Sequence, residues 1–137
     1  MKCFLFIKPK SWAEQGEKVL SAIREMTEGN GWKVSFEKEL VPTREQWKCH
    51  YCHLASKPFF QDLINHFSER KIYSMIIESN DENFFKIIRR EVGPTNLSDP
   101  NSIRGRFGYD VENNVVHCSE TERDAIREIA NMRPDLC

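Results

Sequence analysis

The chain has 137 residues, of which 39% are hydrophobic and 30% charged, and its formal net charge is −1. This length suits one domain with one core, spanning residues 1–137. A charge so close to zero excludes recruitment of nucleic acid or an acidic membrane by a global positive field, so anions must be bound by local basic groups. The sequence has no apolar run long enough for a bilayer or a signal peptide, and we expect a cytoplasmic protein.

The first part of the chain predicts a strand, a helix and a second strand. Residues 3–7 are a continuous apolar run bounded by lysines, which is typical of a buried strand. Apolar residues at helical spacing over 12–26 predict a helix that ends at Gly29-Asn30-Gly31. Residues 32–36 alternate between apolar and polar, which predicts a strand with one wet face.

Two consecutive helices are expected next. Thr43-Arg-Glu-Gln46 has the form of a capping box and opens a helix that runs toward Leu54. Pro58 suits the first position of another helix, whose apolar stripe extends to Phe67. A third strand over residues 72–77 follows, and then a helix that runs from Phe84 into Arg89-Arg90.

Five cysteines in a chain without an export signal favour reduced thiols. Residues 49–53 (Cys-His-Tyr-Cys-His) match the C-x-x-C-H pattern of covalent haem attachment, but that attachment belongs to exported proteins. A zinc site would need further ligands, and the sequence has no second C-x-x-C and no H-x-x-x-H. Coincidence is the favoured interpretation of this segment.

The last third of the chain predicts a long loop, a short strand and a helix. Residues 93–109 have no sustained period, and a loop of that length is usually functional. The fourth strand covers roughly residues 114–116, and Ser119-Glu-Thr-Glu122 has the form of a capping box for the last helix. The element order predicts an α+β, ferredoxin-like (βαββαβ) fold. Its four-stranded antiparallel sheet would carry helices on one face and a helical pair between strands 2 and 3.

The segment Asn114-Val-Val-His117-Cys-Ser119-Glu120 says most about chemistry. His117 lies between a buried strand and the positive start of a helix, a good position for meeting an anionic substrate. Glu128 follows within the helix, where its carboxylate would reach back and orient the ring. A lone histidine at a strand end is more often structural, but this geometry suits a nucleophile that carries a phosphoryl group.

Several further segments accompany the one that contains His117. They are Lys8, Tyr51, Lys57-Pro-Phe-Phe60, Arg89, Gly93-Pro-Thr95-Asn96 and Ser102-Ile-Arg104-Gly105-Arg-Phe107-Gly108. In order and spacing, this set closely resembles the nucleoside diphosphate kinase family. The resemblance runs from Lys8 to about Ala130.

The resemblance implies a ping-pong exchange, in which ATP or another nucleoside triphosphate gives its terminal phosphoryl group to His117 and a nucleoside diphosphate then takes it. The catalytic residues that it implies are His117, Glu128, Ser119, Lys8 and Tyr51. It further implies phosphate contacts from Lys8, Tyr51, Arg89, Thr95 and Arg104, sugar contacts from Asn114 and Lys8, and a base site at Phe59, Leu63 and Val111. Mg²⁺ is expected to arrive on the nucleotide phosphates.

The chain also departs from the family pattern. Cys118 stands where the family usually has glycine, and Glu120 where it has aspartate. The loop between Asn96 and Ser102 is shorter than usual, and in the family that loop builds trimer contacts. We expect a homo-oligomer, either a hexamer or a smaller assembly.

Two alternatives remain open at this point. Cys118 and the atypical segment after the first strand are compatible with a catalytically weak or inactive module that binds nucleotides or other proteins. An RNA-binding domain is less well supported, because the chain is not basic and lacks the basic-aromatic run of such domains. The expected partners are nucleoside di- and triphosphates, with neither a membrane nor nucleic acid among them.

Overall fold

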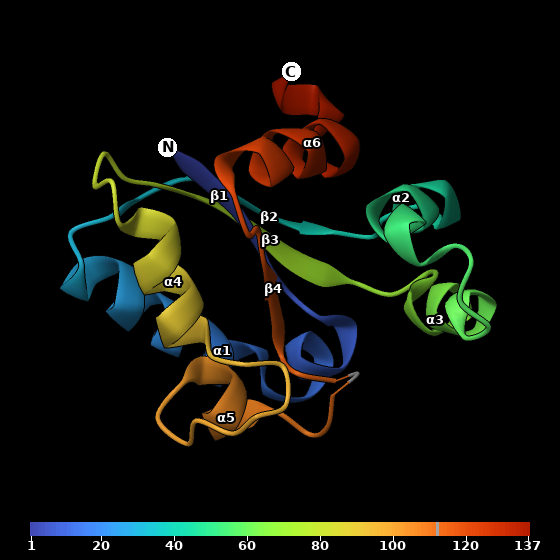
Figure 1. Cartoon of the computed structure of the whole chain (residues 1–137), viewed down its shortest axis with the longest axis horizontal. Helices are drawn as coiled ribbons and strands as arrows, with labels where there is room; N and C mark the ends of the chain where they lie inside the picture. Colours follow the sequence, from blue (N-terminus) through green and yellow to red (C-terminus); the bar gives the residue numbers. More distant parts are fainter. Residues whose placement is uncertain (112) are drawn as a thin grey trace.

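The structure is a computed structural model that describes residues 1–111 and 113–137 (Figure 1). Its four strands form one sheet in the order β2-β3-β1-β4, and every neighbouring pair is antiparallel. The strands are β1 (Lys2–Ile7), β2 (Lys33–Leu40), β3 (Ile72–Glu78) and β4 (Val116–Cys118). The helices are α1 (Pro9–Gly29), α2 (Arg44–His50), α3 (Phe60–Phe67), α4 (Phe84–Val92), α5 (Ile103–Phe107) and α6 (Glu122–Met132), with short 3₁₀ turns at Cys52–Leu54 and Pro134–Leu136.

This arrangement confirms the predicted ferredoxin-like plan, with α2 and α3 as the helical pair between the second and third strands. Helices cover both faces of the sheet, however, so the expectation of a single covered face was wrong. Leu5 and Ile7 lie in a core with α1 and α4, whereas Phe4 and Phe6 pack with α2, α3 and α6 (Figure 1). The reason lies in β1, which is apolar on both of its faces and must be covered on each.

The fourth strand begins two residues later than expected. Val115 has a φ of 79°, and the Val116 N–H donates to the Asn114 carbonyl at 3.0 Å, so residues 114–116 form a γ-turn. Positive φ is unusual for a β-branched residue, because its side chain crowds the backbone. The Lys8 N–H donates to the Val115 carbonyl at 2.8 Å and ties this turn to the end of β1.

Two helix starts also differ from the prediction, and one agrees with it. The capping box at Thr43 is confirmed. The N-cap of α6 is Thr121, whose hydroxyl accepts a hydrogen bond from the Asp124 N–H, so the capping box at Ser119 was wrong. Ser119 pairs with β1 instead, so its hydroxyl does not cap the first turn of α6. Pro58 lies before α3, whose N-cap is Phe59.

The long segment after α4 folds over the carboxyl end of that helix and contains α5. This helix has only five residues, too few to show a helical period in the sequence. Gly105 is required there, because a Cβ atom would lie 1.8 Å from the Asp99 carbonyl oxygen. Among the described residues, no helix is both long and apolar enough to cross a membrane.

Candidate active site

A cleft with a volume of about 570 Å³ opens beside β4 and the carboxyl end of β1. Its lining comes from most parts of the chain, including α2, α4, α5 and α6. Eight of the residues proposed from the sequence line it: Lys8, Tyr51, Arg89, Thr95, Arg104, Asn114, His117 and Glu128. The γ-turn before His117 and the pairing of β4 with β1 therefore bring together side chains that are distant in the sequence.

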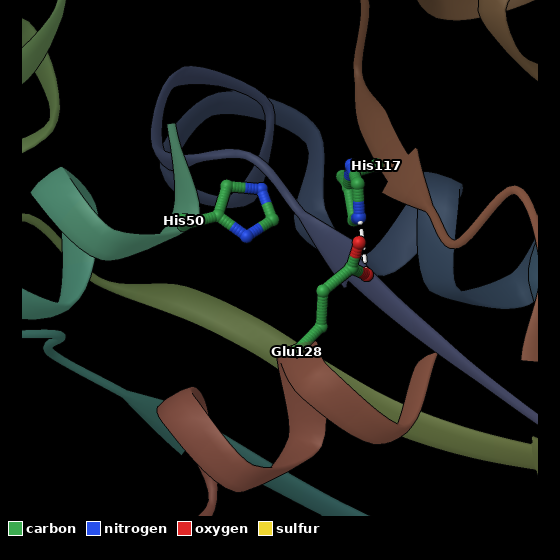
Figure 2. Close-up of side chains that lie close together, drawn as sticks. All are labelled: His50, His117 and Glu128. Carbon is green, nitrogen blue, oxygen red and sulfur yellow. Dashed lines mark hydrogen bonds and ion pairs between the residues drawn. The ribbon is translucent and has the colours of Figure 1, made fainter. Parts of the chain in front are cut away.

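His117 is held by a chain of hydrogen bonds from the sheet to α6. Its Nε2 lies 2.7 Å from Oε1 of Glu128 (Figure 2), and the Ser119 hydroxyl donates to the same oxygen at 2.8 Å. Ser119 Oγ in turn accepts from the Phe4 N–H at 3.0 Å. Because Glu128 Oε1 acts as an acceptor, Nε2 is the protonated nitrogen of the ring. The lone pair is then on Nδ1, which is free to act as a nucleophile.

The surroundings of His117 keep its ring neutral. The ring stacks on Phe6, with centroids 4.9 Å apart. Burial lowers the pKa of His117 to about 3, and the charges of Lys8 and Arg104 add to this effect. The contact with Glu128 is therefore a hydrogen bond from a neutral imidazole. Burial also raises the pKa of Glu128, although the hydrogen bond from Ser119 opposes that shift.

Cationic groups reach the same cleft from separate elements. Arg104 donates to the carbonyls of Gly93 and Val116, both at 2.9 Å, which fixes its guanidinium before any ligand arrives. Lys8 Nζ donates to Asn114 Oδ1 at 2.7 Å, and burial and the nearby Arg104 charge lower the pKa of Lys8 to about 8. Such a concentration of positive charge suits phosphate groups.

Other predicted residues occupy different surroundings. Ser119 is fully buried and touches Glu128 from behind the cleft. Leu63 is partly buried against the core under α3. Phe59 and Val111 are 46% and 63% exposed. A 3.3 Å hydrogen bond between His66 Nε2 and Asn113 Oδ1 ties α3 to the segment that follows Val111.

His50 is not among the site residues predicted from the sequence, and the structure places it against His117. Its ring meets the His117 ring edge to face, with centroids 4.6 Å apart and an interplanar angle of 82°. His50 lies within the segment that matches the haem-attachment pattern, but its position next to Tyr51 was a usable signal. Asp124 and Arg127 were missed as well. They lie one turn and one residue from Glu128 on α6, and both line the cleft.

The comparisons with known proteins agree on one family. Residues 1–135 match the family "Nucleoside diphosphate kinase". The chain is 34% identical to a nucleoside diphosphate kinase of Archaeoglobus fulgidus over 131 residues, which cover 94% of this chain and 83% of that protein. It is 38% identical to one of Methanosphaera stadtmanae over 104 residues, which cover 74% and 67%.

Solved structures give the same result. The apo nucleoside diphosphate kinase of Encephalitozoon cuniculi superposes with a TM-score of 0.85 at 28% identity, covering 96% of this chain and 88% of that one. The Aquifex aeolicus enzyme gives a TM-score of 0.81 at 27% identity, covering 95% and 92%. The sequence match, the fold and the relatives together show that this chain belongs to the nucleoside diphosphate kinase family.

Proposed function

We propose that this chain is a nucleoside diphosphate kinase, which moves the terminal phosphoryl group of ATP to nucleoside diphosphates through a phosphohistidine on His117. The observation that carries the proposal is the 2.7 Å hydrogen bond between His117 Nε2 and buried Glu128. It supports a neutral ring with its lone pair on Nδ1, in a cleft that also holds cationic side chains.

In the first half-reaction, the Nδ1 lone pair attacks the terminal phosphorus of the triphosphate. The N–P bond forms as the bond from phosphorus to the bridging oxygen breaks, and that oxygen leaves on the diphosphate. The ring becomes cationic, and the Glu128 carboxylate stabilises it through the proton on Nε2. The second half-reaction reverses these steps, with the terminal oxygen of another nucleoside diphosphate as the attacking atom.

The cationic and polar side chains of the cleft would stabilise charge on the transferring group. Arg104 is the strongest candidate, because three hydrogen bonds to backbone carbonyls hold its guanidinium in place. Lys8, Tyr51, Arg89 and Thr95 complete the proposed phosphate contacts. Removing one such fixed donor typically lowers the rate by roughly 100- to 1000-fold.

The nucleoside would lie toward the open side of the cleft. We assign Asn114, with Lys8, to the sugar hydroxyls, and Phe59 and Val111, with Leu63 nearby, to the base. The exposed apolar surfaces of Phe59 and Val111 support this assignment. Stacking without hydrogen bonds to the base edges tolerates every base, since each has an aromatic face.

Mg²⁺ fits the cleft as an ion carried by the nucleotide. The carboxylates that line the described cleft already have partners: Glu120 lies 3.4 Å from Arg89, Asp124 accepts from Thr121 and Arg127, and Glu128 is bound by His117. Phosphate oxygens and water would therefore hold the ion. When bound, Mg²⁺ neutralises part of the phosphate charge.

We also propose a homo-oligomer in the cytoplasm. β2 is an edge strand, and Phe36 on it and Val41 after it are 46% and 54% exposed, which supports contact with a second copy. The cytoplasm is a reducing compartment, in which the five free thiols would stay reduced. In the described part of the chain, helices cover both faces of the sheet, which argues against RNA binding across the strands.

The test is labelling with ATP that carries ³²P in its terminal phosphate. The protein should acquire an acid-labile, base-stable label and pass it to a panel of nucleoside diphosphates, and His117→Gln should stay unlabelled. The assembly mass is measured in parallel by sedimentation. An unlabelled wild-type protein would leave the non-catalytic module as the better explanation, and a monomer would refute the oligomer.

A further inference from the structure

His50, His117 and Glu128 meet at the inner wall of the cleft, although they come from α2, β4 and α6. One ring nitrogen of each histidine and one carboxylate oxygen lie within 4.8 Å of one another. Figure 2 shows the two rings and the carboxylate around a common space. His50 is only 4% exposed, and among the described residues its Nδ1 has no hydrogen-bond partner. Buried imidazole nitrogens ordinarily have one, so this orphaned atom requires an explanation.

We propose that these three side chains bind a divalent transition-metal ion of the Zn²⁺ type, and that the bound ion prevents His117 from accepting a phosphoryl group. Two imidazoles and one carboxylate are a set of ligands that Zn²⁺ uses in proteins, with a fourth position left for water. Both imidazoles are neutral, which is the form that binds metals. Binding can be tested on its own, whereas the inhibition rests on the proposed function.

The geometry needs two adjustments to hold such an ion. Ligand atoms around a tetrahedral Zn²⁺, each about 2 Å from the metal, lie roughly 3.3 Å apart. His117 Nε2 and Glu128 Oε1 are closer than that, at 2.7 Å, so they must move apart slightly when a metal replaces the proton between them. The remaining change is a rotation that brings a nitrogen of His50 nearer, and the ring gives up no described hydrogen bond when it turns.

The inhibition follows whichever of its two ring nitrogens His117 uses to bind the metal. A metal on Nε2 takes the position of the proton that now faces Glu128, and a neutral ring then carries its proton on Nδ1. A metal on Nδ1 occupies the attacking lone pair directly. Either way the nucleophile is lost, while the proposed phosphate contacts at Lys8 and Arg104 are untouched. Mg²⁺ would not compete well, because it prefers six oxygen ligands in an octahedron.

Exposed thiols at Cys49, Cys52 and Cys137 also bind Zn²⁺ and must be removed first. In a Cys49→Ser, Cys52→Ser, Cys137→Ser background, the full chain is titrated with Co²⁺ and followed by its visible absorption, with Zn²⁺ as the competitor. One equivalent should bind. His50→Phe keeps an aromatic ring in place and should weaken binding at least tenfold, since even residues around a metal's ligands contribute about that much.

His53→Phe is the matched control for binding. His53 lines the same cleft but lies outside the cluster, so this variant should bind like its parent. Equal binding by the His50 variant, or failure of the parent to bind one equivalent, would refute the site. Circular dichroism shows whether His50→Phe folds, and His50→Asn replaces it if it does not.

A second measurement needs no variant. The chain has four histidines, so their ring ¹⁵N resonances can be followed as Zn²⁺ is added to the unaltered protein. The resonances of His50 and His117 should shift together, and that of His66 should not move. A shift confined to His53 would point to the exposed Cys49 and Cys52 and would contradict the proposal.

Inhibition is measured on protein loaded with one equivalent of Zn²⁺ and freed of excess metal. Its initial rate of labelling by Mg²⁺-ATP should fall at least tenfold and return after a zinc-selective chelator. Equal labelling with and without bound Zn²⁺ would refute the switch. If the protein binds Zn²⁺ at the cluster but is labelled neither with nor without bound Zn²⁺, the proposed metal site stands and the proposed kinase function is refuted.

Discussion

The reactivity of a histidine depends on which nitrogen holds the proton, and here two other residues decide it. Glu128 accepts a hydrogen bond from the protonated Nε2 at 2.7 Å, and Ser119 fixes that carboxylate by donating to the same oxygen. Without them a neutral imidazole in water would exchange between its two tautomers. The buried carboxylate selects one tautomer before substrate binds. A group that accepts a hydrogen bond from the other ring nitrogen does the same for a metal-bound histidine.

Lys8 makes the proposed activity sensitive to alkaline pH. Its pKa is lowered to about 8, so raising the pH through that value removes the ammonium charge that we assign to phosphate binding. We expect kcat/KM to fall above pH 8. It should not fall between pH 8 and pH 5 through ring protonation, because the pKa of His117 is lowered to about 3. The measurement is a profile of kcat/KM, which reports the free enzyme.

Lys8→Arg is the control for that profile. The guanidinium keeps its charge throughout, so the alkaline decline should move to higher pH even though the rate itself falls. A decline that stays near pH 8 in the variant would assign it to another group. Arg104 already contributes a permanent charge to the cleft. Raising the pH therefore removes the charge of Lys8 without removing all the positive charge of the cleft.

At the scale of elements, Ser119 and Thr121 show how neighbouring hydroxyls take different roles. Thr121 caps α6 through the Asp124 N–H at 3.1 Å. Ser119 bridges β1 and α6 by accepting from the Phe4 N–H and donating to Glu128. Local sequence fits a capping role for either residue, and the pairing of β4 with β1 decides between them.

Substituting each hydroxyl separates the two roles. Thr121→Ala should lower the free energy of unfolding by about 1 kcal/mol and leave phosphoryl transfer near the wild-type rate. Ser119→Ala leaves the buried Phe4 N–H unpaired, which costs about 1–3 kcal/mol, and also frees the Glu128 carboxylate, so labelling of His117 should slow. Urea unfolding and labelling rates measure both effects. Similar slowing in both variants would contradict this assignment.

At the scale of the whole molecule, two buried neutral histidines make stability depend on acid. Burial lowers the pKa of His50 and of His117, so below the ordinary value of about 6.5 the unfolded chain binds protons that the folded chain excludes. Stability that is present above that value is lost as the pH falls toward 3. One such proton changes the free energy of unfolding by about 1.4 kcal/mol per pH unit.

His117→Gln should therefore flatten this dependence. Between pH 6 and pH 4, its free energy of unfolding should fall less steeply than that of the wild type, by the contribution of about one proton. Urea unfolding at each pH gives the slope, with exposed His53→Gln as the control. If His117→Gln and the wild type have the same slope, the ring of His117 is not excluded from protonation in the folded state.

The sequence alone determined the order of strands and helices apart from α5, the ferredoxin-like plan and His117 as the candidate nucleophile. Apolar periodicity, turn residues and the motif around His117 are local properties, so they can be read without coordinates. Local information also explains the failures. α5 is too short to show a period, and the capping pattern at Ser119 fits a helix start that the chain places two residues later.

Only the tertiary structure decided which side chains from distant segments meet and which of their atoms interact. It covered both sides of the sheet, put His50 against His117, and selected the protonated nitrogen of the nucleophile. Each of these depends on contacts between distant parts of the chain, such as Ser119 with Phe4, 115 residues apart. Such contacts form only when β1 and β4 pair and the helices pack over them. No stretch of neighbouring residues therefore encodes them.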